Sequence, residues 1–279
     1  MTEHAGIDRC ERERATADLP RGIDASQPNV ARIYDYFLGG KDNFASDRKA
    51  AEDLTRVMPE AAVVARENRK FLQRAVKFIA AEAGIRQYLD IGTGLPTCGN
   101  VHQTAQQWKP GARVLYVDND AVVVAHAQAL LADNTTAIAI NRDMRNPRAI
   151  LDHPALQALF DLDEPMAILL VAILHFIGDD DEPHKLVSEV MDRMPRGSYL
   201  VISHGTADQV APSVTRSVRR LYERTSGTAT ARSLCEVARF FEGCDLIEPG
   251  IVSVSAWRNG FEVPESGRIL CYAGVGIKR

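Results

Sequence analysis

The sequence predicts an α/β protein built on a Rossmann-like sheet of about seven strands, most of them parallel. The first observation is the segment 88–120, where an apolar run leads into Gly92-Thr93-Gly94 and, after a helix-length stretch, a second apolar run ends at Asp118. This order of strand, glycine turn, helix and strand is typical of the nucleotide-binding half of a doubly wound sheet. The second observation is that apolar runs and helical patterns alternate along most of the remaining chain.

Each later element is assigned from its local pattern. We expect strands at 112–117, 135–140, 166–173 and 198–203, and helices at 99–108, 120–132, 147–160 and 182–194. In the last third, an amphipathic helix is expected to be capped by Thr230 and to end at Gly243. Strands near 250–256 and 269–277 lie about a dozen residues apart, so we expect an antiparallel C-terminal hairpin that closes the sheet.

The chain divides into three regions. Residues 1–27 are polar and lack apolar periodicity, so we expect a disordered or loosely ordered tail. Residues 28–84 have helical periodicity and contain the pair Gly39-Gly40, which stops the first helix. We expect this region to form an N-terminal helical lid over residues 85–279, the core that carries the sheet.

The glycine loop distinguishes between nucleoside cofactors. A dinucleotide fingerprint has its third glycine three positions after the second, whereas here Gly99 comes two residues late and Pro96 removes a backbone donor. Asp90, just before the loop, would repel a phosphate but attract a cation. S-adenosyl-L-methionine contains ribose, adenine and an ammonium group but no phosphate, so the loop Gly92-Thr93-Gly94 favours it over NAD or FAD.

Two more acidic residues stand at strand ends, where a nucleoside would bind. Asp118 ends the second strand, and a carboxylate there can accept hydrogen bonds from both ribose hydroxyls. Asp143 follows the third strand and is placed to accept the adenine amino group, with Met144 lying against the ring. The alternative for Asp143 is that it caps the helix that starts near Pro147.

The composition is that of a globular enzyme rather than a nucleic-acid-binding or membrane protein. Of the 279 residues, 46% are hydrophobic and 25% charged, the formal net charge is −4, and no basic segment outweighs its acidic neighbours. No apolar run reaches 18 residues, the N-terminus lacks an apolar signal core, and the five cysteines form no C-x-x-C pair. We therefore expect a cytoplasmic protein with reduced thiols and no nucleic-acid or membrane partner.

A resemblance to a known family rests on five segments. These are YDYFLGGKDNF at 34–44, RENR at 66–69, the loop DIGTGLPT, the strand end YVDND and the closing YAGVGIKR. Together they resemble a bacterial S-adenosyl methyltransferase family within the class I S-adenosylmethionine-dependent methyltransferases, whose seven-stranded sheet ends in such a hairpin. The resemblance covers residues 28–279 and implies the fold and the cofactor. It also implies three groups of cofactor-binding residues: the loop residues Asp90, Gly92 and Gly94, the ribose pair Asp118 and Asn119, and the adenine pair Asp143 and Met144.

The acceptor side of the reaction is less defined. Open α/β sheets bind ligands beyond the carboxyl ends of their strands, where His175 and His204 follow the fourth and fifth strands. His175 is the candidate catalytic base, with packing against Phe176 and backbone hydrogen bonding as the alternative. The acidic run 179–182 could hold a divalent metal, but a helix start also favours acids, and we assign no metal site.

A cation for the methionine carboxylate is missing from the loop around Asp90. Arg66 and Arg69 share one side of the preceding helix, and a guanidinium fork suits a carboxylate, so we assign Arg69, with solvation or pairing to a nearby acid as the alternative. The sequence therefore predicts a methyltransferase that uses S-adenosyl-L-methionine on an unidentified small molecule. The alternatives are a regulatory protein that binds the cofactor without catalysis and, less favoured, an NAD-dependent oxidoreductase.

Overall fold

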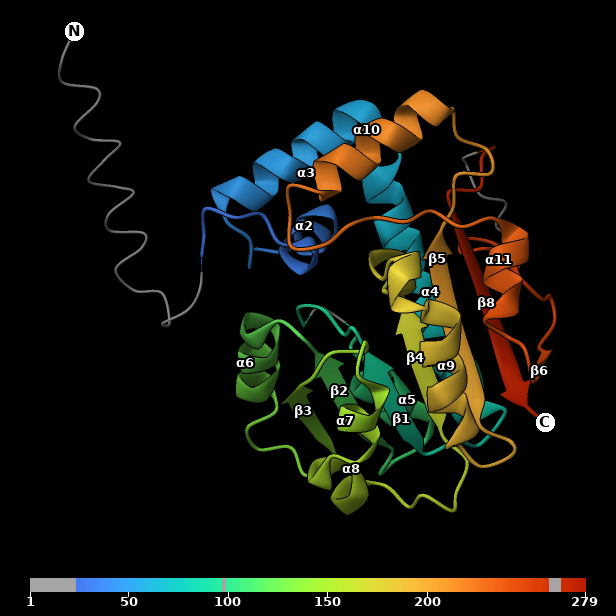
Figure 1. Ribbon diagram of the computed structural model, residues 1–279. Coiled ribbons are helices and arrows are strands. Elements are labelled where there is room, and N and C mark those ends of the chain that lie inside the picture. The colour runs from blue at the N-terminus through green and yellow to red at the C-terminus, as the bar shows by residue number, and fades with distance from the viewer. Residues whose placement is uncertain (1–23, 97–98, 261–266) are drawn as a thin grey trace, which may run out of the picture.

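The computed structural model describes residues 24–96, 99–260 and 267–279. Figure 1 shows a twisted sheet with helices on both faces and a further group of helices beyond one end of its strands. The predicted tail lies outside the described residues, except for residues 24–27. Among the described residues, no helix is both long and apolar enough to cross a membrane.

The described strands form one eight-stranded sheet in the order β3-β2-β1-β4-β5-β8-β6, with β7 beside β8. The strands are β1 Gln87–Ile91, β2 Arg113–Asp118, β3 Ala137–Asn141, β4 Ala167–Val171, β5 Tyr199–Gly205, β6 Cys244–Leu246, β7 Val252–Ser253 and β8 Cys271–Lys278. All pairings among β1 to β5 are parallel, as predicted. The chain turns outward in opposite directions after β1 and β4, and this switch point opens a crevice at their carboxyl ends.

The C-terminal strands are antiparallel as predicted, but their arrangement differs from the expected hairpin. β8 is not an edge strand, because it pairs with β5 on one side and β6 on the other. The expected strand 250–256 shortens to the two residues of β7. The outer strand is β6, which the sequence pattern missed because only Cys244 of its three residues is buried. A strand of three residues with one buried side chain carries no alternation from which to predict it.

The helices cover both faces of the sheet. One face packs against α4 Ala61–Ala81, α5 Val101–Trp108 and α6 Ala121–Leu130. The other packs against α7 Pro147–Leu151, α8 Pro154–Leu159, α9 Pro183–Asp192 and α11 Leu234–Arg239. Residues of β1, β2 and β4 are buried on both faces, which explains why these strands read as continuous apolar runs.

The predicted N-cap of α11 is wrong. The side chain of Ser233, not Thr230, accepts the backbone N–H of Glu236, and the Glu236 carboxylate accepts the backbone N–H of Ser233. This reciprocal pair is a capping box, which the sequence spacing S-x-x-E already indicated. The backbone N–H of Thr230 instead donates to the carbonyl oxygen of His175, at 2.7 Å.

A third hydrophobic core lies beyond the carboxyl ends of the strands and forms what we call the cap. It contains α2 Val30–Phe37, α3 Ala45–Val57, the first turns of α4, and α10 Pro212–Tyr222. Ile33 and Leu54 are each 1% exposed, and Val218 of α10 packs against the same cluster. The cap therefore joins the predicted N-terminal helices to a helix from the last third of the chain (Figure 1).

The loop after α2 is folded around the carboxylate of Asp35. Its Oδ2 accepts hydrogen bonds from the backbone N–H of Asp42, at 3.0 Å, and from Nδ2 of Asn43, at 2.8 Å. Gly39 has a positive φ of 81° and ends the helix, as predicted. Gly40 passes so close to Asp35 that a β-carbon would overlap the carboxylate.

Replacing Gly40 with alanine is expected to lower the free energy of unfolding by about 1–3 kcal/mol, because the new methyl group must displace the Asp35 carboxylate from its hydrogen bonds. Urea denaturation followed by circular dichroism measures the loss. Gly178→Ala is the control, since no atom lies within 4 Å of its added methyl group. Equal losses for the two variants would show that Asp35 does not organise this loop.

Candidate functional site

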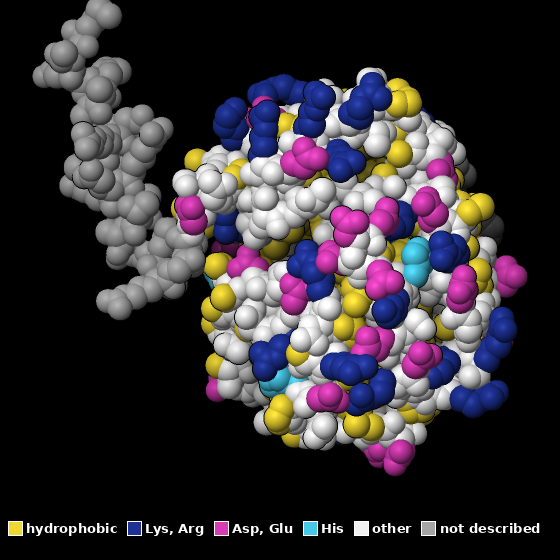
Figure 2. All heavy atoms as spheres, viewed as in Figure 1, with side chains coloured by type: hydrophobic (Ala, Val, Ile, Leu, Met, Phe, Trp, Pro, Cys, Tyr) yellow, Lys and Arg dark blue, Asp and Glu magenta, His cyan; other side chains and the backbone are white. Residues whose placement is uncertain are grey.

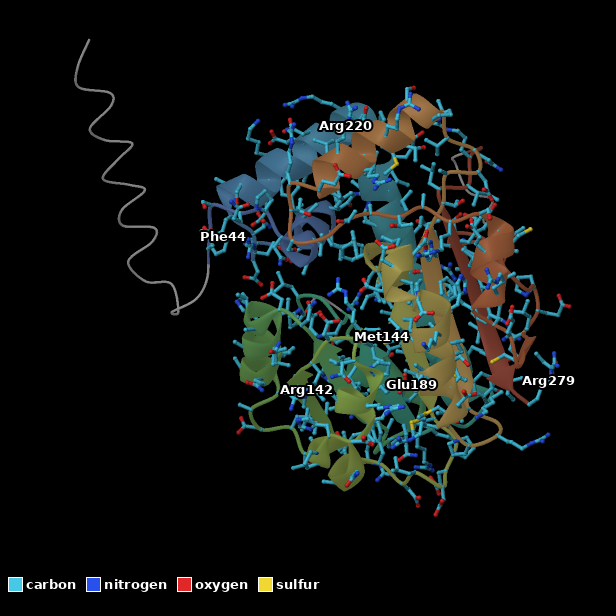
Figure 3. All side chains as sticks on the ribbon, viewed as in Figure 1. Phe44, Arg142, Met144, Glu189, Arg220 and Arg279 are labelled. Atoms are coloured by element: carbon cyan, nitrogen blue, oxygen red, sulfur yellow. The ribbon has the colours of Figure 1, made fainter. Side chains whose placement is uncertain are left out.

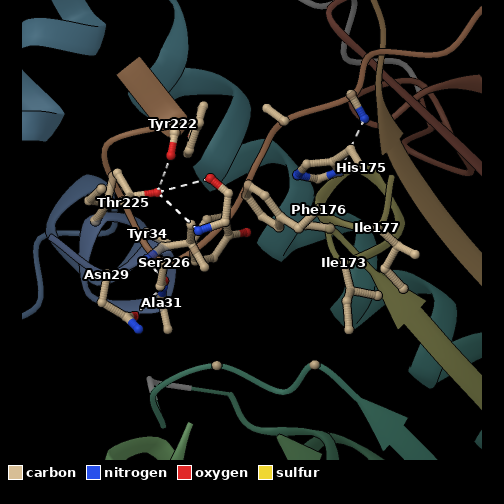
Figure 4. A pocket seen from close by; sticks show the side chains of 18 of the residues that line it. Asn29, Ala31, Tyr34, Ile173, His175, Phe176, Ile177, Tyr222, Thr225 and Ser226 are labelled. Carbon is tan, nitrogen blue, oxygen red and sulfur yellow. Dashed lines mark hydrogen bonds between the residues drawn. The ribbon is translucent and has the colours of Figure 1, made fainter. Parts of the chain in front are cut away.

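A large cavity lies between the carboxyl ends of the strands and the cap (Figure 4). Its volume is about 1870 Å³, whereas a site for one drug-sized ligand has roughly 300–1,000 Å³. The cavity can therefore hold two small molecules at once. Every residue predicted to bind the cofactor or to catalyse lines it, namely Arg69, Asp90, Gly92, Thr93, Gly94, Asp118, Asn119, Asp143, Met144 and His175.

The two glycines of the β1 loop have different roles. Both have positive φ, 75° at Gly92 and 66° at Gly94. A β-carbon on Gly92 would overlap the side chain of Ile173, so a glycine is needed here for Ile173 to pack against the loop. In front of Gly94 no atom lies within 4 Å, so the close approach of a ligand is possible there. Gly92 also lines the cavity, so its assignment to the cofactor loop stays a prediction.

The Asp118 carboxylate holds the glycine loop against the end of β2. Oδ2 accepts the backbone N–H of Gly94, and Oδ1 accepts that of Asp120, each at 2.9 Å. The residue is 8% exposed, and burial raises its pKa. Each oxygen keeps a second lone pair for a ligand, so Asp118 can support the loop and bind hydroxyl groups together.

At the end of β3, Asp143 is bonded to its neighbours rather than to a helix. It accepts Nδ2 of Asn119 at 3.1 Å and two hydrogen bonds from Arg145 at 2.8 Å. Burial tends to raise the pKa of Asp143, but these hydrogen bonds lower it overall. The N-cap of α7 is Asn146, so the alternative capping role of Asp143 is wrong. Met144 is 2% exposed and lies in the core at the cavity floor (Figure 3).

Asp90 and Arg69 face each other across the start of the glycine loop. Burial raises the pKa of Asp90 to about 7, although the charge of Arg69 and a 3.2 Å hydrogen bond from Thr93 Oγ1 oppose this rise. Arg69 donates through Nη2 to Gly99 O and Asn100 Oδ1, each at 3.2 Å. Its buried Nε has no partner among the described residues. Arg69 therefore lines the cavity and keeps a buried donor that no described residue uses.

Sequence reasoning missed Asn68, the neighbour of Arg69 on α4. It is 3% exposed, lines the cavity, and donates to the hydroxyl of Tyr34 at 2.8 Å. Tyr34 in turn donates to the carbonyl of Ala65 at 3.0 Å. The buried Oδ1 of Asn68 has no partner among the described residues. The available sequence signal was its place in the family-like segment RENR at 66–69, which gave Asn68 no role of its own.

A hydrogen bond between two helix caps links the cap to the sheet. Asn29 is the N-cap of α2, Asp120 is the N-cap of α6, and Nδ2 of Asn29 donates to Oδ2 of Asp120 at 2.6 Å. The bond lies two residues from Asp118, at the mouth of the cavity. No local sequence pattern indicates this contact, because the two residues are 91 positions apart.

His175 lies at the cavity wall after β4, as predicted. Its Nδ1 is 3.4 Å from the backbone nitrogen of Gly205, and its ring centroid is 4.3 Å from that of Phe176. Burial, with the nearby His204 and Arg232, lowers its pKa to about 3. A histidine with this pKa stays neutral at physiological pH and takes up a proton only weakly.

The acidic run 179–182 is held by cations of the protein. Asp179 pairs with Arg232 at 2.5 Å and Asp181 with Arg145 at 3.1 Å. Glu182 pairs with Lys185 at 3.1 Å. Within the described ranges, no three histidine, cysteine, aspartate or glutamate side chains are grouped closely enough to hold a metal ion.

The strand order, the glycine loop after β1 and the acids at three strand ends define a class I methyltransferase. The sequence model of the S-adenosyl methyltransferase family matches residues 16–279, so the chain belongs to that family. The protein is an S-adenosylmethionine-dependent methyltransferase, which confirms the predicted class and cofactor and leaves the NAD interpretation without support.

Solved structures agree with this assignment. A DUF574 family protein from Streptomyces avermitilis is 41% identical, with 92% of this chain and 99% of that one covered and a TM-score of 0.87. A protein from Thermobifida fusca assigned to the methyltransferases is 39% identical, with 95% and 100% covered and a TM-score of 0.88. The N-methyltransferase NodS of Bradyrhizobium japonicum, in complex with S-adenosylhomocysteine, shares the fold at 13% identity, with 88% and 98% covered and a TM-score of 0.50. No curated protein matches the sequence.

The raised pKa of Asp90 predicts a pH-dependent stability. Between about pH 4 and pH 7 the folded protein retains a proton that the unfolded chain has released. The contribution of Asp90 to the free energy of unfolding is therefore complete below about pH 4 and is lost as the pH rises to about 7. Relative to wild type, Asp90→Asn should become progressively more stable across this range in urea denaturation of the ligand-free protein. A constant difference between the two proteins would contradict a buried, protonated Asp90.

Proposed function

We propose that the cavity binds S-adenosyl-L-methionine along the carboxyl ends of β1, β2 and β3 and a small-molecule acceptor beside His175. The observation that carries the proposal is that acids from three strand ends and the cation Arg69 all line one cavity. The cap closes this cavity on the side away from the sheet. It corresponds to the lid predicted for residues 28–84, with α10 as an additional helix. Enclosure by the cap suits a small acceptor better than a nucleic acid or a membrane surface.

The methionine end fits the wall formed by α4 and the β1 loop. Arg69 Nε and Asn68 Oδ1 are a buried donor and a buried acceptor on adjacent residues, and neither has a partner in the described part of the chain. A carboxylate would satisfy the first, and an ammonium group would satisfy the second together with Asp90. These unpaired atoms fit a zwitterionic amino acid, and they are costly if nothing binds there.

The nucleoside end fits the ends of β2 and β3. Asp118 would accept the ribose hydroxyls, and the side chain of Asn119 would lie beside them. Asp143 would accept the adenine amino group, with Met144 beneath the ring. The hydrogen bond from Asn29 to Asp120 would then close the cap directly over the ribose.

The segment 34–44 shapes the lid. Its Asp35 folds the loop, and the following residues Lys41, Asp42 and Asn43 line the cavity. We attribute the sequence hallmark of this segment to that role, since substitution of Gly40 or Asp35 would unfold the loop that faces the ligand.

Methyl transfer from a sulfonium needs little beyond alignment, because the methyl carbon is already activated. The protein's contribution is to hold acceptor and methyl group in line and to exclude water. The rigid sheet aligns the two groups through the β1 and β4 loops, and the cap excludes water.

The decisive experiment is calorimetry with S-adenosylhomocysteine and NAD. We expect S-adenosylhomocysteine to bind and NAD not to bind. Asp118→Ala should weaken S-adenosylhomocysteine by roughly 1.5–3 kcal/mol, the loss of two hydrogen bonds to a charged group. Wild type should also prefer adenosine to its dideoxy analogue lacking both ribose hydroxyls, and Asp118→Ala should lose this preference. A variant that weakens both nucleosides equally would show that Asp118 supports only the loop.

Arg69→Met tests the methionine end. It should weaken S-adenosylmethionine by at least tenfold but leave 5′-methylthioadenosine, which lacks the carboxylate, nearly unchanged. The matched control is Arg66→Met on the same helix, whose guanidinium reaches the carbonyl of Phe37 at 3.4 Å. Equal losses for both ligands with Arg69→Met would assign Arg69 to folding instead.

A further inference from the structure

The part of the cavity beside His175 is separate from the residues proposed to hold the cofactor. Its walls are aromatic and aliphatic: the Phe176 ring contacts that of Tyr222 with centroids 5.4 Å apart, and Ile173 and Ile177 lie below (Figure 4). The returning segment 225–230 closes it on the far side. We call this part the acceptor compartment. Aromatic walls of this kind favour a planar ligand.

The proton positions on His204 and His175 each follow from one hydrogen bond that the ring accepts, from Arg232 and from the backbone of Gly205 respectively. A guanidinium only donates, so Arg232 Nη1, 3.0 Å from His204 Nε2, makes that nitrogen an acceptor. The proton of His204 is then on Nδ1, which donates to the carbonyl of Gly205 at 2.8 Å. The backbone N–H of Gly205 in turn points to Nδ1 of His175. His175 therefore carries its proton on Nε2.

This tautomer makes Nε2 of His175 a hydrogen-bond donor. A general base needs a free lone pair facing the substrate, and the free lone pair of His175 is turned to Gly205. The low pKa of His175 agrees with this, since a group with a pKa near 3 does not retain a substrate proton at neutral pH. An acceptor here must therefore offer an atom that accepts a hydrogen bond, and its nucleophile must react without losing a proton first.

The charges around the compartment disfavour an anionic acceptor. The guanidinium groups nearest to it already pair with carboxylates: Arg232 with Asp179, Arg145 with Asp143 and Asp181, and Arg219 with Glu223. Asp180 also lines the cavity. A carboxylate or phosphate beside these ion pairs would lose its hydration and would compete with the protein's own carboxylates for the guanidinium groups.

We propose that the acceptor compartment takes an uncharged planar nitrogen heterocycle that also carries a carbonyl or second ring nitrogen, and that His175 holds it as a hydrogen-bond donor. This inference rests on the proposed function. A ring nitrogen has a lone pair and no proton to lose. That lone pair forms the new N–CH₃ bond while the S–CH₃ bond breaks with its electrons remaining on sulfur, so the positive charge passes from sulfur to nitrogen. The aromatic faces of Phe176 and Tyr222 are suited to that cation.

Four small probes separate these features by calorimetry on protein saturated with S-adenosylhomocysteine. Meta-acetylpyridine has the ring nitrogen and the carbonyl, meta-ethylpyridine lacks the carbonyl, nicotinate carries a carboxylate, and meta-hydroxyacetophenone replaces the ring nitrogen with a phenol. We expect the acetyl compound to bind roughly 3- to 10-fold more tightly than the ethyl compound, the difference made by one hydrogen bond. Nicotinate should bind least. With S-adenosylmethionine, only the two uncharged pyridines should be methylated.

Two variants of His175 test its role directly. His175→Gln keeps an N–H donor but cannot act as a base. His175→Leu has no N–H donor and cannot act as a base. The preference for the acetyl over the ethyl compound should survive in the first variant and disappear in the second. Nitrogen NMR of the histidine rings should show a protonated Nε2 on His175 and the opposite tautomer on His204.

Several results would overturn the proposal. These are tighter binding of nicotinate, methylation of the phenol alone, a proton on Nδ1 of His175, or no binding of meta-acetylpyridine at millimolar concentration. The titration with S-adenosylhomocysteine alone distinguishes failure of the proposed cofactor site from failure of the proposed acceptor class. Failure of S-adenosylhomocysteine to bind would contradict the proposed cofactor site, whereas its binding followed by failure of the probes would contradict only the acceptor class.

Discussion

The central strands are buried on both faces, and the position of the site follows from this constraint. Residues of β1 and β4 pack between two layers of helices, so a charged side chain along their length would lose its hydration without compensation. Polar groups are tolerated where the strands end. Parallel pairing then brings these ends to one edge of the sheet, with Asp90 level with Tyr116 and Asp118 level with Asn141. Polar functional side chains gather at this edge because burial between the helix layers disfavours them elsewhere in the central strands.

Much of this arrangement could be predicted from local patterns. The apolar runs of the five parallel strands, the stop at Gly39 and the acids at the strand ends are all short-range features, and the structure places them as expected. The same reasoning placed His175 correctly after β4. It did not determine what the histidine does, since that depends on which ring nitrogen carries the proton.

The features that escaped prediction depend on contacts between distant segments. Arg232 fixes the tautomer of His204, the backbone N–H of Gly205 fixes that of His175, and Asn29 reaches Asp120 across the cavity mouth. Gly92 owes its missing side chain to Ile173, a neighbour only in the folded sheet. No periodicity or motif encodes such pairs, because each partner looks ordinary in its own segment. The capping box at Ser233 differs in kind, since its spacing was present in the sequence.

The composition of the cap has a consequence for how the chain is made. The helices α2 and α3 leave the ribosome first, yet α10, which packs against them, comes from the last third of the chain. Chains fold from the N-terminus as they are synthesised, so the part of the early helices that α10 covers stays exposed until α10 itself has been translated. Basic side chains gather over α3 and α10 in Figure 2, with Arg220 labelled on α10 in Figure 3. Their charge keeps the outer surface of these helices hydrated while the inner surface lacks its partner, which limits association between nascent chains.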